Sequence, residues 1–262
     1  MSWDGARGSE IALASSPSET ARFGHAVERL TVGSDWKREC TRVQLGERLH
    51  ELLASSAART IILRYPSDAP FVPQELGNHG RALYPAGSLL YWERVEPFPP
   101  SPGGVTMLQS PGIVEDVMSQ LRAVLADSFA GYINHYSVNP LIREDAITDG
   151  YLEWAESTIL DPGNRVFLLS IDGRAAGVAT VECPEDASHW EIQLAGMISS
   201  LQGKGHYAQL VGGVLAAARE FGVPRVIIST QAHNVRVQRA WARLGFLPFA
   251  SIDTVHLVRP PG

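Results

Sequence analysis

A short glycine-containing loop between a strand-like and a helix-like stretch constrains the fold of this chain most. The loop is Gln202–Tyr207; it follows the apolar stretch Ile192–Ser199 and leads into the helix-like stretch Tyr207–Phe221. The first amides of a helix have no partner within the helix, and the helix dipole adds partial positive charge there. Small residues let an anion approach these amides, and Lys204 adds a full charge. The loop is therefore predicted to bind a phosphate or a diphosphate.

This loop resembles the acyl-CoA diphosphate loop of the GCN5-related N-acetyltransferase (GNAT) superfamily, whose pattern is Gln/Arg-x-x-Gly-x-Gly/Ala. Gln202 and Gly205 fit the pattern, whereas Tyr207 stands where the family usually has Gly or Ala. Because ordinary strand-to-helix turns also contain glycines, the loop alone is weak evidence. A second block, Asn234–Phe246, resembles the family's later Asn-x-x-Ala-x-x-x-Tyr-x-x-x-Gly-Phe helix, and the strand-like Arg225–Thr230 separates the two blocks. Together the blocks are specific for this superfamily.

Composition excludes several other classes of protein. The chain has 262 residues, a net charge of −6 and 45% hydrophobic residues, which is ordinary globular composition without the basic surface that a nucleic-acid partner requires. Cys40 and Cys183 are too few for a disulfide framework or a zinc cluster. No apolar run approaches the roughly 18 residues of a membrane span, and no signal region opens the chain. We therefore expect a cytoplasmic protein with no membrane and no nucleic-acid partner.

The pattern of elements predicts two folded parts. We expect a flexible N-terminal tail over 1–26, a small α/β domain over 27–97, a linker rich in proline and glycine over 98–112, and the acetyltransferase domain over 113–262. The predicted fold class is α/β (α+β), a GNAT fold in which flanking helices cover a mixed central sheet. Asp172-Gly173 is the strongest hairpin signal and joins the strand-like stretches Val166–Ile171 and Ala175–Val181.

The resemblance implies that acetyl-CoA is the co-substrate and that no metal takes part. Diphosphate binding is expected from the loop, namely Gln202, Gly203, Lys204, Gly205, His206 and Tyr207. The preceding strand of the family pairs its main chain with the pantetheine arm, which by position implicates Met197, Ile198 and Ser199. The family places an asparagine near the cofactor, here Asn234, whose position at a helix start also predicts an N-cap.

Trp241 is the main departure from the family, because many members have there a tyrosine that protonates the departing CoA thiolate. An indole nitrogen only donates hydrogen bonds and does not release its proton. A thiol has a pKa of about 8.5, so its thiolate is a good leaving group. The thiolate either leaves unassisted or is helped by Tyr207 or a water molecule. Trp241 itself is expected to pack beside the cofactor.

Acetyl transfer to an amine also requires a base, because most alkylamines are protonated at neutral pH. Glu191 lies near the position where several family members carry a strand glutamate, and His135 is the second predicted catalytic residue. His189, Gln193 and His206 are other nearby candidates. The alternative to a catalytic role for Glu191 is that it lies at a solvated strand end. The alternative for His135 is that it holds its own loop in place by hydrogen bonds.

One segment narrows the choice of acceptor. Asn134–Pro140, followed by Tyr151–Trp154, resembles the acceptor-side segment of nucleotide-linked (dTDP or UDP) amino-sugar N-acetyltransferases, which also carry a small N-terminal α/β domain. That group often has a histidine where Ser137 stands here. The resemblance implies that Tyr136 and Asn139 bind hydroxyl groups of a sugar.

Two other functions remain open at this stage. The acceptor could be an amine on an antibiotic or another natural product, since only acceptor contacts differ between such enzymes. Alternatively, Tyr207 and Trp241 could mark a degenerate domain that binds CoA, or nothing, and serves as an interaction module. A homodimer through an exposed strand edge is also left open.

Overall fold

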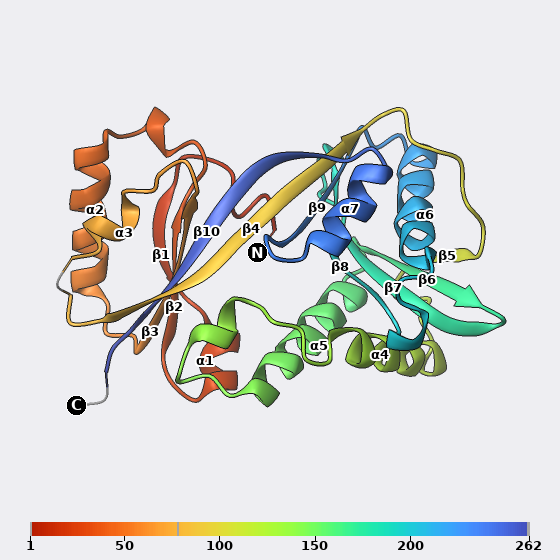
Figure 1. Ribbon diagram of the computed structural model, residues 1–262, viewed down its shortest axis with the longest axis horizontal. Helices are drawn as coiled ribbons and strands as arrows, with labels where there is room; N and C mark the ends of the chain where they lie inside the picture. Colours follow the sequence, from red (N-terminus) through yellow and green to blue (C-terminus); the bar gives the residue numbers. More distant parts are fainter. Residues whose placement is uncertain (1, 78, 261–262) are drawn as a thin grey trace. The chain divides into compact units, whose positions relative to one another are not determined.

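The computed structural model describes residues 2–77 and 79–260 and divides the chain into two compact units (Figure 1). Unit one comprises Met1–Leu90, Ile133–Ile147 and Ala250–Gly262, and unit two comprises Tyr91–Tyr132 and Thr148–Phe249. The chain therefore passes from one unit to the other at 90/91, 132/133, 147/148 and 249/250. Two long strands, β4 (Ala82–Val95) and β10 (Leu247–Val258), contain the first and the last of these points.

The strands of unit one lie in the order β1-β2-β3-β10. Strands β2 and β3 are parallel, and the β1–β2 and β3–β10 pairs are antiparallel. A parallel pair needs a crossover, which here contains helix α2. The elements are β1 (Ile11–Ser15), α1 (Pro17–Phe23), β2 (Val27–Val32), η1 (Trp36–Arg38), α2 (Arg42–Ser55), β3 (Thr60–Pro66), α3 (Val72–Glu75) and η2 (His135–Val138).

Helix α2 begins at Arg42 because Thr41 and Gln44 form a capping box. The Thr41 hydroxyl accepts the Gln44 amide, and the Gln44 side chain accepts the Thr41 amide at 2.9 Å. Leucines at helical spacing then face the strands, and their burial supplies the apolar core of unit one. The leucines of α2 in this core are Leu45, Leu49 and Leu53.

Unit two has the strand order β4-β9-β8-β7-β6-β5. The β8–β9 pair is parallel, whereas the pairs β5–β6, β6–β7 and β7–β8 are antiparallel. This mixed sheet with flanking helices confirms the predicted fold class. Its further elements are β5 (Val105–Leu108), α4 (Glu115–Phe129), α5 (Glu144–Leu160), β6 (Arg165–Ile171), β7 (Arg174–Glu182), β8 (Trp190–Met197), η3 (Ser199–Leu201), α6 (His206–Glu220), β9 (Arg225–Gln231) and α7 (Val235–Arg243).

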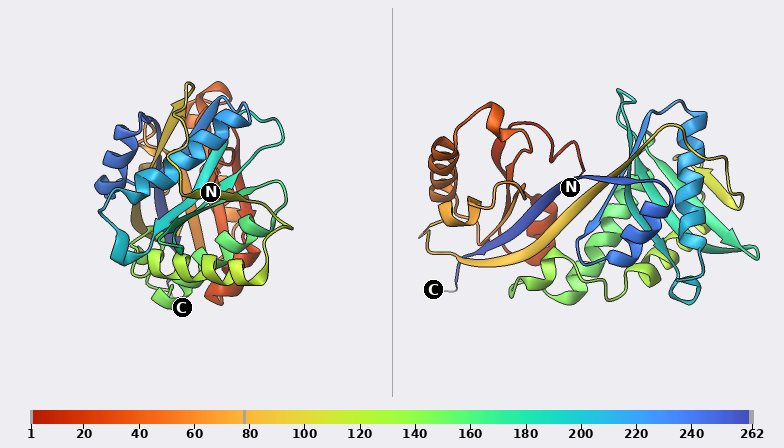
Figure 2. Two further views of the ribbon diagram at one scale, coloured as in Figure 1. Left: turned by 90° about the vertical axis from the view of Figure 1, so that its right-hand side faces the viewer. Right: turned by 45° about the horizontal axis from the view of Figure 1, so that its top comes forward.

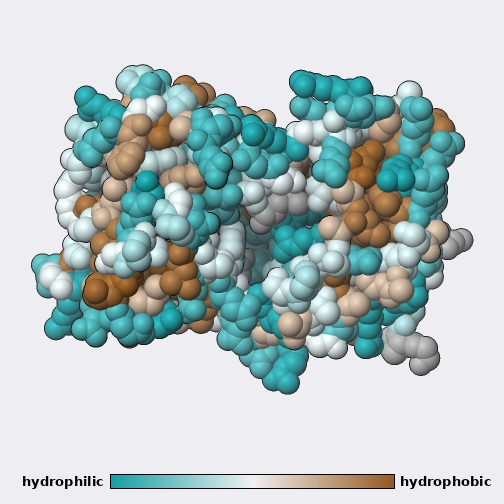
Figure 3. All heavy atoms as spheres, turned by 180° about the vertical axis from the view of Figure 1, so that it is seen from behind, coloured by the Kyte–Doolittle hydropathy of each residue, from teal (hydrophilic) through white to brown (hydrophobic). Residues whose placement is uncertain are grey.

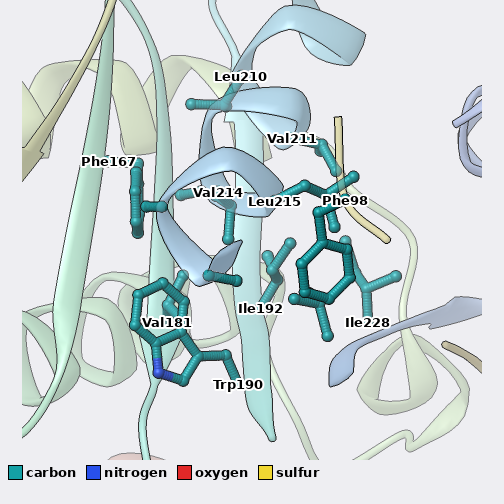
Figure 4. Packing of buried hydrophobic residues seen from close by; sticks show 14 of the residues in the cluster. Phe98, Phe167, Val181, Trp190, Ile192, Leu210, Val211, Val214, Leu215 and Ile228 are labelled. Carbon is teal, nitrogen blue, oxygen red and sulfur yellow. The ribbon is translucent and has the colours of Figure 1, made fainter. Parts of the chain in front are cut away.

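Helices α4 and α6 cover opposite faces of the sheet in unit two (Figure 2). Beneath α6 lies the larger core, in which Val214 and Leu215 of the helix meet aromatic and aliphatic side chains of the strands (Figure 4). Beneath α4 lies a second core, built with α5. Helices therefore pack on both faces of β7 and β8.

The predicted hairpin is confirmed. Asp172 and Gly173 both have positive φ, at 50° and 74°, and Ile171 pairs with Arg174 across the turn. A two-residue turn of this kind requires positive φ at both positions, and glycine adopts it without steric cost.

The first 26 residues are not the tail that the sequence predicts. Strand β1 pairs with β2 from Ile11↔Val32 to Ser15↔Glu28, and α1 follows it. Ile11 and Leu13 pack against the core of unit one, while Glu19 of α1 is buried. The Ser- and Ala-rich composition conceals this strand because only two of its residues are large and apolar.

The unit boundaries also differ from those that the sequence predicts. Residues 133–147 and 250–262 belong to unit one rather than to the acetyltransferase part. The first segment joins unit one through buried polar side chains, and the second because Ile252–Val258 pairs with Thr60–Pro66. Distant pairings of this kind leave no local signal in a sequence.

On the face that Figure 3 draws, hydrophobic residues gather in several patches between hydrophilic ones. Within the described residues, no helix is long and apolar enough to cross a membrane. In the same residues no group of three or more His, Cys, Asp or Glu side chains is placed to hold a metal ion.

Candidate active site

The predicted diphosphate loop leads directly into the N-terminus of α6. Gly203 and Gly205 have φ of 80° and 90°, a region that residues with a side chain rarely adopt, and Gly205 is the N-cap of α6. No side chain caps this helix start, and its first turn contains no acidic residue. Gln202 holds the loop to the preceding strand, because its Nε2 donates to the Met197 carbonyl at 3.1 Å. The Ala208 and Gln209 amides donate to the Gly205 carbonyl, so the positions at which amides can face an anion are His206 and Tyr207, the first two of the helix.

A second cation lies at this loop that the sequence analysis did not identify. A Cβ at Gly203 would lie 2.8 Å from Nη2 of Arg236, so this guanidinium rests against the loop backbone. Arg236 is the second residue of α7, two positions after Asn234. Its position two residues after Asn234 could have suggested a phosphate ligand. However, only the fold brings the start of α7 to the loop. With Lys204, the loop has two positive side chains.

Strands β8 and β9 part just before the loop. Trp190–Ile192 pairs in parallel with Val226–Ile228, and in this fully described stretch no pairing continues beyond these residues. Strand β8 nevertheless runs on to Met197 and β9 to Gln231. The main-chain edge of β8 that follows Ile192 is therefore not paired with β9, and an unpaired strand edge is what an extended ligand can pair with.

A β-bulge lies where the strands part. Thr180 pairs with Leu194 and Val181 with Ile192, so Gln193 has no partner of its own in β7. The bulge reverses the alternation of side chains. Ile192 packs in the core beneath α6, whereas Leu194 packs in the core beneath α4. The sequence gives no sign of this bulge.

The main-chain groups that the sequence assigns to pantetheine are partly occupied. The Ile198 amide donates to the Ala176 carbonyl at 2.9 Å, and the Ser199 amide donates to the Asp127 carboxylate. The Met197 carbonyl accepts the Gln202 side chain. Of the predicted Met197–Ser199, two amides and one carbonyl are therefore hydrogen-bonded within the protein, and the chain bends into η3 at Ser199.

Glu191, the first predicted base, is buried immediately before the bulge and not at a solvated strand end. It is 2% exposed and pairs across the sheet with Glu182 and Ile227. Since its neighbour Ile192 faces α6, the Glu191 side chain lies on the opposite face, that of α4. A second carboxylate, Glu182, accepts a hydrogen bond from Nε2 of the Gln193 side chain.

Asn234 and the pair Trp241–Tyr207 each make hydrogen bonds with side chains of neighbouring elements. Asn234 Nδ2 donates to Thr230 Oγ1 at 3.1 Å, and the Tyr132 hydroxyl lies 3.4 Å from the same oxygen. Asn234 occupies the N-cap position, but the predicted capping bond is not made because its side chain turns to Thr230. Trp241 is buried and donates its indole N–H to the Tyr207 hydroxyl at 3.1 Å.

His206, also assigned to the loop, is the first residue of α6 and is half-buried. Its Nδ1 lies 3.4 Å from Oε1 of Gln209, so the ring lies along its own helix. The hydrogen bond orients the imidazole near the free amides of the first turn.

The remaining predicted residues, His135, Tyr136 and Asn139, lie in unit one, in or just after η2. Arg64 donates to His135 Nε2 at 3.0 Å, and His135 Nδ1 lies 3.0 Å from His256 Nε2. A guanidinium only donates, so neutral His135 carries its proton on Nδ1 and gives it to His256. Asn139 Nδ2 lies 3.1 Å from His256 Nδ1.

Tyr136 belongs to the same buried cluster through an ion pair. Its hydroxyl donates to Glu19, which also accepts two hydrogen bonds from Arg29 at 2.8 Å. Burial, together with the adjacent Glu19 charge, raises the pKa of Tyr136 to about 12. Burial lowers the pKa of His135 well below its ordinary value, and the Arg64 charge adds to this. His135 is therefore neutral, with both ring nitrogens engaged.

Comparison with known proteins agrees with this geometry. Residues 122–246 match the sequence model of the acetyltransferase (GNAT) family. No curated protein sequence matches the chain. Among solved structures, a GCN5-related N-acetyltransferase from Sphaerobacter thermophilus has a TM-score of 0.57 at 16% identity, over 92% of this chain and 75% of that one.

Two further structures are similar in fold. A putative GNAT-family acetyltransferase from Novosphingobium aromaticivorans has a TM-score of 0.52 at 16% identity, covering 89% of this chain and 84% of that one. A GCN5-related glucosamine N-acetyltransferase region of a fungal multi-domain β-N-acetylglucosaminidase has a TM-score of 0.54 at 10% identity, over 88% of this chain and 30% of that one.

The fold, the loop and the family match together define an acetyltransferase domain of GNAT type over residues 122–246. The matched residues, 125 of the 262 in the chain, are therefore similar to N-acetyltransferases of this family, which generally use acetyl-CoA, and the fold of the chain is similar to that of solved GNAT structures.

Proposed function

We propose that this protein transfers the acetyl group of acetyl-CoA to the amine of an amino sugar linked to a nucleotide. The observation that carries the proposal is the loop before α6, where glycines of positive φ lead into an uncapped helix start, Lys204 lies within the loop and the Arg236 guanidinium adjoins Gly203. Such a loop suits a diphosphate. The parted strands beside it offer the β8 edge to a pantetheine arm.

The amino-sugar part of the proposal rests on two likenesses. One is the resemblance of the segment Asn134–Pro140 to acceptor segments of nucleotide-linked amino-sugar acetyltransferases. The other is the similar fold of a glucosamine N-acetyltransferase region, which acts on an amine of a sugar. Both cysteines are free, which suits the reducing cytoplasm in which we place the reaction.

Of the two predicted bases, the proposal selects Glu191. Both ring nitrogens of His135 are engaged within unit one, and a neutral histidine beside Arg64 is a weak base. Glu191 lies beside the bulge, where the β8 edge becomes open. We assign His135, Tyr136 and Asn139 the role of holding their segment in place.

Calorimetric titration with acetyl-CoA and with CoA tests the first half of the proposal. Saturable binding of both is expected, and no binding at millimolar concentration would contradict it. Thiol release with acetyl-CoA then tests the acceptor, using glucosamine, dTDP- and UDP-linked amino sugars, and an aminoglycoside. Turnover with the nucleotide-linked sugars alone supports the proposal; turnover confined to the aminoglycoside overturns its acceptor.

The base is tested by Glu191→Gln, with Glu182→Gln as the matched control on the paired strand. We expect kcat/KM for the Glu191 variant to fall by about 10²- to 10⁴-fold, the usual contribution of a general base, while acetyl-CoA affinity is unchanged. Equal losses in both variants, or none in either, would show that Glu191 does not remove the proton.

A further inference from the structure

We propose that the pocket between α4 and the turn of the β6–β7 hairpin binds a free α-amino acid with an apolar side chain. The pocket has a volume of about 560 Å³, which is within the range of small-molecule sites. Of the described residues, neither Gln202–Tyr207 nor Glu191 lines it. The inference therefore goes beyond acetyl transfer, and binding in this pocket needs no acetyl-CoA.

Three segments that are distant in the sequence form the walls of the pocket. Helix α4 contributes residues 120, 123, 124 and 127, a spacing that places them on one face of the helix. Arg174 comes from the first position of β7, directly after the hairpin turn, and Ser200 comes from η3. All three segments belong to unit two, so the pocket lies within one compact unit.

Arg174 and Asp127 carry opposite charges and line the same pocket without pairing with each other. Both are exposed, and among the residues that the structure describes the Arg174 side chain forms no ion pair and no hydrogen bond. A guanidinium has five donors in a planar arrangement and binds a carboxylate through two parallel hydrogen bonds. Arg174 is therefore available to the carboxylate of a ligand.

Asp127 is held in position by the chain that follows β8. Its carboxylate accepts the Ser199 amide and, at 3.2 Å, the Ser199 hydroxyl. An ionised carboxylate has about four acceptor positions, so about two remain for a further donor. An ammonium group offers three donors and a positive charge, which makes it a suitable partner for this carboxylate.

The combination of the two charges selects a zwitterion. A simple anion such as phosphate would bind Arg174 but would be repelled by Asp127, and a simple amine would be repelled by Arg174. An α-amino acid carries both charges, with a carboxylate for Arg174 and an ammonium group for Asp127.

The floor of the pocket indicates the kind of side chain that the amino acid carries. Val124 is 3% exposed and belongs to the core beneath α4, and Ala175 and Ile198 pack against the same core. An apolar side chain on the ligand would remove this apolar surface from water, which favours binding.

Ligand-observed NMR titration of the whole chain with leucine tests the proposal. N-acetyl-leucine lacks the ammonium group and leucine amide lacks the carboxylate, so these two compounds are the ligand controls. We expect saturable binding of leucine at millimolar concentration. Each control compound should bind at least about tenfold more weakly, because one charge-assisted contact is lost.

Arg174→Gln and Asp127→Asn locate the site, with Arg239→Gln and Asp116→Asn as matched controls. Asp116 is exposed on the same helix as Asp127 and does not line the pocket. Asparagine keeps an oxygen that can accept the Ser199 amide, so Asp127→Asn removes the charge without removing this hydrogen bond. Both pocket variants should weaken leucine binding at least about tenfold, whereas both controls should stay within about twofold of the wild type.

Three results would overturn the inference. They are the absence of binding by leucine and every other apolar amino acid at millimolar concentration, equally tight binding of N-acetyl-leucine, and unchanged leucine binding in Arg174→Gln. An unchanged melting temperature of this variant shows that it is folded, as expected for an exposed side chain. Because the titration contains no acetyl-CoA, its outcome is independent of the test of the proposed function.

Discussion

Arg236 is a ligand that we propose for the predicted diphosphate loop, and its own sequence neighbourhood does not indicate this role. It is exposed on α7, and its guanidinium rests against Gly203 of the diphosphate loop. A guanidinium binds phosphate oxygens in a bidentate way that a lysine does not reproduce. Sequence reasoning identified Lys204 because it lies within the loop, and missed Arg236 because the contact bridges 33 positions in the chain (236 minus 203).

Arg236→Gln should therefore weaken the binding of acetyl-CoA. We expect the dissociation constant to rise about 5- to 20-fold at low salt, from the loss of one charge-assisted contact near the protein surface. The loss should shrink as ionic strength rises, because salt screens exposed charges. Calorimetric titration at two salt concentrations measures both effects.

Arg239→Gln is the matched control, since Arg239 is an exposed arginine on the same helix. Its dissociation constant should stay within twofold of the wild type if the contact at Gly203, and not net charge, governs binding. Equal weakening by both variants would speak for a diffuse charge effect instead.

At the scale of elements, the sequence predicts most of unit two. The hairpin at Asp172–Gly173, the strand before the loop and the helices after it have local causes, namely turn residues and hydrophobic periodicity. The bulge at Gln193 and the early end of the open β8 edge escaped prediction. Both depend on which neighbouring strand a residue pairs with, and nothing in β8 itself records that choice.

Strand β1 is the element for which sequence and structure disagree most, and it yields a test. Leu13 packs against the core of unit one, whereas its neighbour Ala14 is exposed. Leu13→Asp should lower the free energy of unfolding by about 1–3 kcal/mol, because it removes apolar contact and buries a charge. Ala14→Asp should change it by less than about 0.5 kcal/mol.

Chemical denaturation followed by circular dichroism compares these two variants. A flexible tail would make the two substitutions equally harmless, so equal stability would favour the sequence-based expectation over the strand. Limited proteolysis gives a second readout, since only a disrupted strand should expose residues 10–16 to cleavage.

For the whole molecule, the buried polar cluster of unit one makes stability depend on pH. Burial and the Arg64 charge lower the pKa of His256 to about 4, and His135 is lowered in the same direction. The unfolded chain binds these protons near pH 6.5, so the unfolded state gains stability as pH falls from about 6.5 to 4. Burial raises the pKa of Glu19, but hydrogen bonds and charge from Arg29 outweigh this and lower it to about 2.

Glu19 therefore adds a second loss of stability at lower pH, from about 4.5 to 2, where the unfolded carboxylate is protonated first. The free energy of unfolding should fall by about 2–4 kcal/mol between pH 6.5 and 4 through the two histidines. In His256→Gln, which cannot take up a proton, this fall should be clearly smaller. Urea denaturation at several pH values measures it, and an identical slope in both proteins would contradict the assignment.

The four points at which the chain changes units restrict how this protein can be divided. Neither unit corresponds to a continuous stretch of the gene, since each is completed by segments that lie inside or beyond the other. A fragment that ends at residue 90 or 112 would contain Thr60–Pro66 without its partner strand Ile252–Val258. A fragment that begins after residue 90 or 112 would contain Ile252–Val258 without Thr60–Pro66. Halves of this protein should therefore recover activity only when they are expressed together.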